Sequence, residues 1–183
     1  MLSCFSVTTD TAPGPDALPP PGRPPVGEAV GFLLSQLGFT VSRRFGELLA
    51  SLGLEPRHFA LMRAIGASEG QAQHVLAGAL HIPASSLVSL VDDLEARGLV
   101  ERRAHPTDRR ARTLHLTVSG TTQLEAALTV AMDLEDRLCT GIEPDDRLAA
   151  VAVLKQVAQN LGLVDGVHPN VGRGPLGEPS AGD

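Results

Sequence analysis

The sequence of 183 residues lacks the residue patterns that mark enzymes and metal proteins. It has only two cysteines, Cys4 and Cys139, and their separation matches neither a disulfide framework nor a zinc-binding spacing. It contains no Gly-rich phosphate loop, no nucleophile elbow and no recognisable pair of catalytic carboxylates. We therefore expect no catalytic activity, no metal and no cofactor.

Long apolar runs are missing as well. No segment reaches the roughly 18 uninterrupted apolar residues that a membrane-spanning helix needs. The N-terminal segment lacks the basic leader and the apolar stretch of a secretory signal, and it is rich in Thr and Pro instead. Together with the scarcity of cysteine, these absences predict a cytoplasmic protein without a membrane partner.

Positive charge is scarce overall but concentrated in one place. The net charge is −6, and the segment 82–96 contains no basic residue. Between Glu101 and Arg112, by contrast, five arginines stand against two acidic residues, which gives this segment a charge of +3 and leaves −9 for the remainder. The location of charge matters more for nucleic-acid binding than the total. We therefore predict that this segment forms a projecting basic surface on an otherwise acidic protein.

The segment 82–117 is the most informative part of the chain. Its first half spaces four apolar residues as in a helix with one buried face: Leu87, Leu90, Val91 and Leu94. Ser85 and Ser86 suit the start of this helix, since hydroxyl side chains can cap free N–H groups. Arg97-Gly98 suits its end, because Gly readily adopts the left-handed conformation.

The second half of this segment changes to the alternation of a strand. Leu99-Val100 begins an extended run, residues 112–117 alternate, and residues 105–108 form a polar turn that contains proline. This pattern predicts a β-hairpin. Five arginines lie on it: Arg102, Arg103, Arg109, Arg110 and Arg112.

Apolar periodicity predicts further helices on both sides. We expect them over residues 30–52, 56–66, 71–80, 124–138 and 144–161. The first helix and the last two carry wider apolar stripes than one small domain needs, which favours a homodimer. The Pro-rich N-terminal segment and the Gly- and Pro-rich C-terminal segment are predicted to be tails.

The residues from Ser85 to Arg102, then Asp108-Arg109-Arg110, then Leu116-Thr117-x-x-Gly120 resemble the winged helix-turn-helix of MarR-type bacterial transcription regulators. The resemblance implies a mainly α fold with a small β-hairpin wing, in which a winged helix-turn-helix is joined to a helical dimerisation region. The implied domains are a disordered tail at 1–27, a regulator domain at 28–163 and a flexible tail at 164–183. Within the regulator domain, residues 28–53 and 118–163 would form the dimer, and residues 54–117 would bind DNA.

The function implied by this resemblance is a dimeric regulator that binds a pseudo-palindromic operator in double-stranded DNA. It would act as a repressor that a small-molecule effector releases. Candidate effector-binding residues, chosen by position, are Arg43, His58 and Met62.

The resemblance also implies the DNA-binding residues. The recognition helix would present four residues to the major groove: Ser85, Ser86, Val88 and Ser89. The wing would follow the DNA backbone with its five arginines, Arg102, Arg103, Arg109, Arg110 and Arg112. Arg110 would enter the minor groove at the wing tip, and Asp108 would orient it.

The chain departs from the family pattern in its recognition helix. Asp92, Asp93 and Glu95 would repel phosphate if they faced DNA, and Asp93 stands where family members often carry Arg or Lys. His81 takes a place often held by Gly, although histidine tolerates a left-handed conformation better than most residues.

Two alternatives stay open. One is a winged helix kept for protein interaction or dimerisation, which would bind random duplex DNA weakly and without a steep salt dependence. The other is a redox sensor that acts through Cys139, although Asp133, Glu135 and Asp136 make its surroundings acidic.

Overall fold

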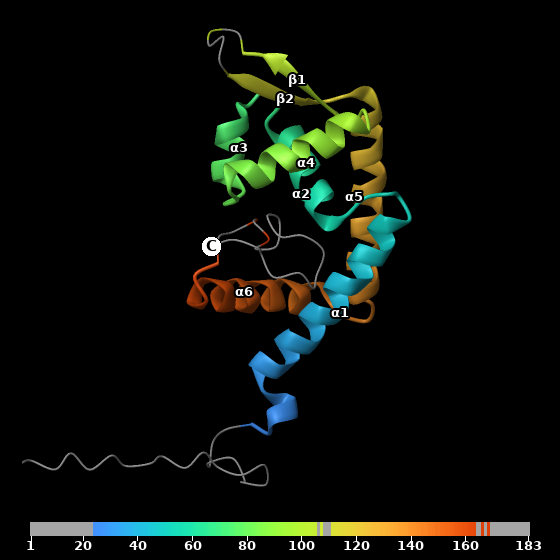
Figure 1. The fold of residues 1–183 in the computed structure, drawn as a ribbon. Helices are drawn as coiled ribbons and strands as arrows, with labels where there is room; N and C mark the ends of the chain where they lie inside the picture. Colours follow the sequence, from blue (N-terminus) through green and yellow to red (C-terminus); the bar gives the residue numbers. More distant parts are fainter. Residues whose placement is uncertain (1–23, 106, 108–110, 164–165, 167, 169–183) are drawn as a thin grey trace, which may run out of the picture. The chain divides into compact units, whose positions relative to one another are not determined.

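The computed structural model describes residues 24–105, 107, 111–163, 166 and 168 (Figure 1). Helices dominate this part of the chain, and the expected mainly α fold with one small hairpin is confirmed. The elements are η1 (Val26–Glu28), α1 (Val30–Ala50), α2 (Pro56–Ala67), α3 (Gln73–Ala79), α4 (Ala84–Ala96), β1 (Val100–Ala104), β2 (Arg112–Leu116), α5 (Val118–Leu138) and α6 (Pro144–Asn160).

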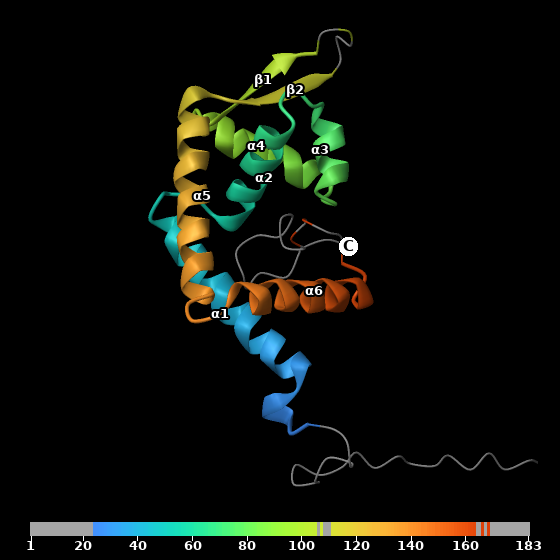
Figure 2. The same ribbon diagram turned by 180° about the vertical axis from the view of Figure 1, so that it is seen from behind.

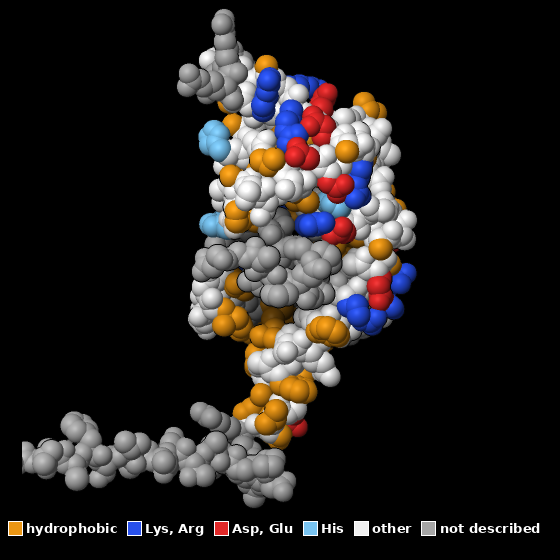
Figure 3. All heavy atoms as spheres, viewed as in Figure 1, with side chains coloured by type: hydrophobic (Ala, Val, Ile, Leu, Met, Phe, Trp, Pro, Cys, Tyr) orange, Lys and Arg blue, Asp and Glu red, His pale blue; other side chains and the backbone are white. Residues whose placement is uncertain are grey.

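The chain divides into two compact units, residues 1–42 and 43–183. In the described part of the first unit, large apolar side chains are exposed to solvent and are visible in orange on α1 (Figure 3). They are Val30, Phe32, Leu33, Leu37 and Phe39. The predicted tail residues 1–23 lie outside the described residues, as do most of residues 164–183.

The second unit has its core beneath the hairpin. There α2 and α4 pack together, α2 also contacts β2, and α5 packs against α2 and β2 (Figure 2). The apolar side chains predicted for the recognition helix all point into this core, because Leu87, Leu90, Val91 and Leu94 are buried. The hydrophobic effect therefore fixes which side of α4 is left for solvent.

The hairpin is antiparallel, and its register pairs Val100 with Leu116 and Ala104 with Arg112. Residues before α3 extend it, because Ala72 forms a bridge with Thr113 and the Leu114 N–H donates to the Gln71 carbonyl at 3.1 Å. This pairing explains why α3 begins at Gln73 rather than at the expected residue 71. A residue whose backbone bonds to a strand cannot also continue a helix.

Other boundaries differ from the sequence prediction as well, most of all the start of α5, which lies at Val118 rather than at residue 124. The second helix runs through Gly66 to Ala67, and Gly66 packs so tightly that a Cβ there would lie 3.1 Å from Leu124 Cδ2. α4 has Pro83 as its N-cap and no side-chain cap, so the expected capping by serine is wrong. Thr117 ends the strand early because its side chain caps α5, accepting from the Gly120 N–H at 2.9 Å.

The turn between α3 and α4 contains His81 with a φ of 52°, so histidine does adopt the left-handed conformation there. Among the described residues, no single helix has the length and apolar character of a membrane span. Only α3 and α4 taken together, across a bend of 114°, reach them, and both helices bury apolar side chains in the core.

The last helix buries none of its residues within the chain. Its exposed apolar side chains are Leu148, Val151, Val153 and Leu154, and the C-cap residue Leu161 is exposed as well. On α5, Leu128, Met132 and Leu138 are exposed as well. The apolar surface predicted from the sequence is therefore present on α5 and α6.

Candidate nucleic-acid interface

The solvent-facing side of α4 presents the residues predicted to read DNA. Ser85, Val88 and Ser89 are exposed, and Ser86 is half-buried. The Ser89 hydroxyl donates to the Ser85 carbonyl at 3.3 Å, which leaves its lone pairs available. Hydroxyl and small apolar side chains on the first turns of such a helix can contact base edges and thymine methyl groups.

The acidic residues of α4 are paired with basic side chains. Asp92 Oδ1 lies 2.6 Å from Arg102 Nη2, and Glu95 pairs with the same guanidinium through Nη1. Asp93 Oδ2 lies 2.9 Å from Arg97 Nη2. Blue and red side chains accordingly lie side by side on this face of the molecule (Figure 3). Pairing reduces the phosphate repulsion that these carboxylates would otherwise cause.

Arg102 joins the hairpin to α4. Its side chain is only 21% exposed, and besides its two carboxylate partners its Nε donates to Gln73 Oε1 at 3.4 Å. The Glu95 carboxylate also accepts the backbone N–H of Arg102 at 3.2 Å. The structure thus places this predicted DNA-binding arginine in an ion-pair network between the wing and the recognition helix.

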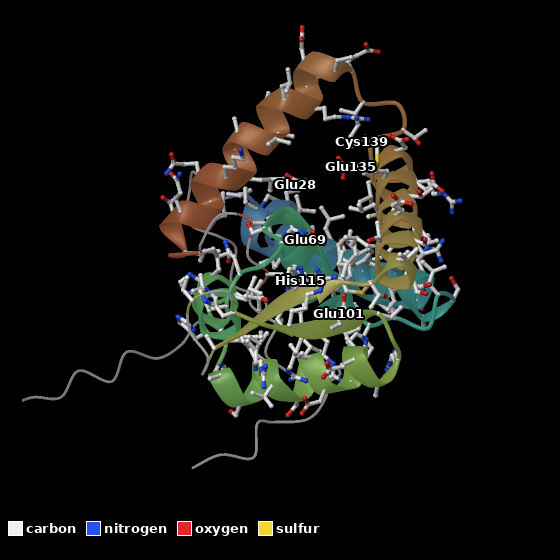
Figure 4. The ribbon with its side chains drawn as sticks, turned by 90° about the horizontal axis from the view of Figure 1, so that it is seen from above. Glu28, Glu69, Glu101, His115, Glu135 and Cys139 are labelled. Atoms are coloured by element: carbon white, nitrogen blue, oxygen red, sulfur yellow. The ribbon has the colours of Figure 1, made fainter. Side chains whose placement is uncertain are left out.

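The other wing arginines differ from one another. Arg103 forms an ion pair with Glu101, and its Nη1 lies 3.5 Å from His115 Nδ1. Glu101 and His115 face each other on the two strands of the hairpin (Figure 4). Arg112 is exposed and makes no ion pair with any residue that the structure describes. Asp108, Arg109 and Arg110 lie outside the described residues. Arg112 is therefore the described wing arginine best placed to neutralise a phosphate.

A shallow pocket of about 270 Å³ lies beside Arg112. It is lined by α3, the start of α4 and the hairpin, through Gln73, His74, Ala77, Ala84, Leu87, Ala111 and Arg112. The sequence predicted no role in the site for either Gln73 or His74. Their position next to Arg112 follows from the pairing of residue 72 with the hairpin, which no local pattern could have indicated.

A larger cavity of about 440 Å³ lies between the start of α2 and α4. Residues of the recognition helix and charged residues near the start of α2 line it. They are Glu55, Arg57, Ser86, Ser89, Leu90, Asp93 and Arg97. Both arginines in it are engaged, since Arg57 Nε lies 2.9 Å from Glu55 Oε2 and Arg97 pairs with Asp93.

The three candidate effector residues do not converge. Met62 is fully buried in the core, and Arg43 forms an exposed ion pair with Glu47 along α1. His58 is fully buried, and its Nδ1 accepts the Glu55 N–H at 3.1 Å. Burial first, and then the nearby Arg97, lower the pKa of His58 below its ordinary value of 6.5.

Cys139 ends α5 beside Glu135 (Figure 4). Its Sγ lies 3.4 Å from Glu135 Oε1, and partial burial followed by this hydrogen bond raises the pKa of the thiol. A raised pKa lowers the thiolate fraction that oxidation requires, which disfavours the redox alternative. In the described part of the chain, no three His, Cys, Asp or Glu residues are grouped as metal ligands.

Two short helices followed by a β-hairpin, with an exposed polar face on the second helix and a partly basic hairpin beside it, define a winged helix-turn-helix protein. A family model described as the MarR family matches residues 52–111. A protein of Thauera aromatica, named for transcriptional regulation of the hcr operon, is 28% identical over 129 residues, which are 70% of this chain and 78% of that protein.

Solved structures agree. The transcriptional repressor CouR, bound to a 23-mer DNA duplex, is 32% identical with a TM-score of 0.65, and the match covers 73% of this chain and 94% of that one. CouR from Rhodococcus jostii RHA1 bound to p-coumaroyl-CoA is 29% identical with a TM-score of 0.63, covering 79% of this chain and 99% of that one. The chain belongs to the MarR family, and it is a transcriptional regulator rather than an enzyme.

Proposed function

We propose that this protein is a homodimeric repressor that binds a pseudo-palindromic operator and is released from it by a small-molecule effector. The observation that carries the proposal is the division of α4, whose apolar side is buried and whose side with Ser85, Val88 and Ser89 is exposed, while Arg112 of the hairpin lies beside the start of the helix. A helix held in this way can enter a major groove while the hairpin follows the backbone.

The proposed DNA contacts fall into two groups. Ser85, Ser86, Val88 and Ser89 would contact base edges or nearby phosphates. Arg103, Arg109, Arg110 and Arg112 would contact the backbone, with Arg110 in the minor groove and Asp108 orienting it. Arg102 belongs to neither group, because its guanidinium already binds Asp92 and Glu95; we propose that it holds the wing in place.

The proposed dimer rests on exposed apolar side chains. Leu148, Val151 and Leu154 project from a helix that buries nothing within its own chain, and the N-terminal half of α1 is exposed in the same way. Burying such stripes against a second copy removes apolar surface from water. We propose residues 28–53 and 118–163 as the dimerisation region, and residues 54–117 as the DNA-binding part.

Repression and release are supported by relatives rather than by a feature of this chain. One CouR structure shows a transcriptional repressor bound to DNA, and another, of CouR from Rhodococcus jostii RHA1, is bound to p-coumaroyl-CoA. The structure favours neither His58 nor Met62 as a direct effector contact, because both are buried and His58 is already bonded. We propose only the class of effector, a small organic molecule.

The test combines sedimentation with DNA binding. The protein would be used to select duplexes from a random-sequence pool, and fluorescence anisotropy would then compare a selected duplex with random duplex over a range of salt. A dimer that prefers its selected duplex, with affinity falling steeply as salt rises, supports the proposal. A chain that selects no duplex and binds random DNA weakly would instead be an interaction module.

A further inference from the structure

A buried histidine and a half-exposed carboxylate connect α2 to the recognition helix. His58 is fully buried, and its Nδ1 accepts the Glu55 N–H, so the proton of the neutral ring lies on Nε2. His58 Nε2 lies 2.8 Å from Asp93 Oδ2, with its N–H turned off the direct line to that oxygen. The imidazole therefore brings the start of α2 into contact with the C-terminal part of α4.

Asp93 is also connected, through Arg97, to the segment between α1 and α2. Its Oδ1 accepts Arg97 Nε at 3.1 Å, and Arg97 Nη1 donates to the Gly53 carbonyl at 2.8 Å. Gly53 and Glu55 flank Leu54 in the short connection between α1 and α2. Asp93 and the C-cap residue Arg97 thus contact two points of that connection: Arg97 reaches Gly53 directly, and Asp93 reaches Glu55 through His58.

Packing alone does not require these groups. An apolar side chain of similar volume at position 58 would fill the same space without the cost of burying a polar ring. A carboxylate that is 40% exposed on a DNA-reading helix is also unfavourable near phosphate. What the polar contacts add is direction, because the hydrogen bonds from the Glu55 N–H to His58, from Arg97 to Asp93 and from Arg97 to the Gly53 carbonyl require a defined geometry.

The rotation of α4 matters for the residues that would read DNA. Asp93 lines the same cavity as Ser86 and Ser89, so all three lie along one side of the helix. Any turn of α4 about its axis that moves Asp93 away from His58 also moves these serines. In a dimer, the positions of the two reading helices determine the separation at which two half-sites fit.

We propose that His58 and Asp93 are positioning residues for operator recognition, which hold α4 at a fixed angle to the α1–α2 connection and so set the half-site spacing that the dimer accepts. This inference rests on the proposed function, because it requires a dimer that reads two half-sites. Neither residue contacts DNA in this account. Both act through the serines of α4.

The experiment measures spacing preference. The probes are a duplex that the wild-type protein selects from a random-sequence pool and the same duplex with one base pair inserted between its half-sites. We expect Asp93→Asn to lower the affinity ratio of the two duplexes by about tenfold, a typical size for coupled residues in one network. His58→Leu should act in the same direction, whereas His58→Gln, which can still accept from Glu55 and keeps a polar group near Asp93, should stay closer to wild type.

Glu69→Gln is the matched control. It makes the same change of charge at an exposed position that lies outside the proposed dimerisation region and outside the residues proposed to contact DNA. Thermal unfolding confirms that each variant is folded at the assay temperature. Asp93 is half-exposed, so its variant is expected to fold even if His58→Leu does not.

Each outcome is decisive. If folded Asp93→Asn keeps the wild-type affinity ratio, or if His58→Gln loses as much of it as Asp93→Asn does, then the positioning role is excluded while the proposed function stands. If the wild-type protein selects no duplex at all, the proposed function fails and this inference fails with it. A loss of affinity that is equal for both duplexes would show a general effect on folding and would also overturn the proposal.

Discussion

Gly120 lies so close to Leu99 that a Cβ at this glycine would be 1.9 Å from the Leu99 carbonyl oxygen. The same carbonyl accepts the Thr117 N–H at 3.1 Å, and the Thr117 hydroxyl donates to the Gly98 carbonyl at 2.6 Å. Thr117 and Gly120 therefore fasten the start of α5 to the base of the hairpin. This contact is the physical reason for the Leu-Thr-x-x-Gly pattern in the sequence.

Gly120→Ala is expected to lower the free energy of unfolding by about 1–3 kcal/mol, because the backbone carbonyl of Leu99 must move to admit the methyl group. Gly78→Ala is the matched control. Gly78 is also helical but has no neighbouring atom within 4 Å of an added Cβ, so alanine should gain up to about 1 kcal/mol there. Urea unfolding of both variants measures the difference, and equal effects would contradict the close contact.

The wing arginines should differ in their effect on the salt dependence of DNA binding. Arg112 has no carboxylate partner among the described residues, so Arg112→Ala should reduce the slope of log affinity against log salt by about one. Arg103→Ala removes a guanidinium that is already paired with Glu101 and should change the slope less. Anisotropy titrations on random duplex test this, and a larger loss for Arg103→Ala would reverse the assignment.

Leu154→Asp should dissociate the proposed dimer without unfolding the chain. Leu154 is 49% exposed and α6 buries nothing within its own chain, so an aspartate costs little in the monomer but several kcal/mol in a buried interface. Sedimentation should show a monomer, and operator binding should be lost although no DNA-facing residue is changed. Gln156→Asp, with the same charge change on another side of α6, is the control; dissociation of both variants would argue against a specific stripe.

The free energy of unfolding should fall as the pH is lowered below about 6.5, the ordinary pKa of histidine. The folded-state pKa of His58 lies below that value, so between the two pKa values the unfolded chain binds the proton more tightly. The stability that His58 contributes is therefore present above pH 6.5 and is lost as the pH falls through the folded-state pKa. Protonation would also place a second N–H against the Glu55 N–H.

His58→Gln should remove this part of the pH dependence, because glutamine does not titrate. The groups facing the ring, Glu55, Arg57, Asp93 and Arg97, are kept in the comparison, so the difference between the two unfolding curves reports on the histidine. Denaturant unfolding at a series of pH values measures it. Curves that stay parallel down to pH 5 would mean that His58 does not titrate as expected.

Local pattern was enough to predict most of the fold. The apolar spacing of Leu87, Leu90 and Leu94 reports on one helix at a time, and the hairpin shows itself by alternation, so both were visible without tertiary information. The errors came where distant segments meet. Gly66 reads as a helix end but is a packing site under Leu124, and residue 72 reads as helix but bonds to the hairpin.

The location of the candidate site could be predicted from the sequence, but the ion pairs of its charged side chains could not. The segment containing α4 and the wing was identified from its own residues, and the exposed positions of Ser85, Val88 and Ser89 match the prediction. The partners of Asp93 and Arg102 were hidden, because His58 and Glu95 come near them only when α2 and the hairpin fold against α4. A sequence lists charges, but only the fold shows which are neutralised.

The paired acids and bases of α4 and β1 also bear on how fast this protein could find its operator. The time that a protein stays on random chromosomal DNA grows with the number of its basic side chains that can replace counterions of the phosphates. Here Arg97 is already paired with Asp93, and Arg102 with Asp92 and Glu95. Such a surface is attracted weakly to duplex of arbitrary sequence, so less of the protein is held away from its target. We therefore expect Arg97 and Arg102 to contribute little to the salt-dependent attraction of this protein to DNA of arbitrary sequence.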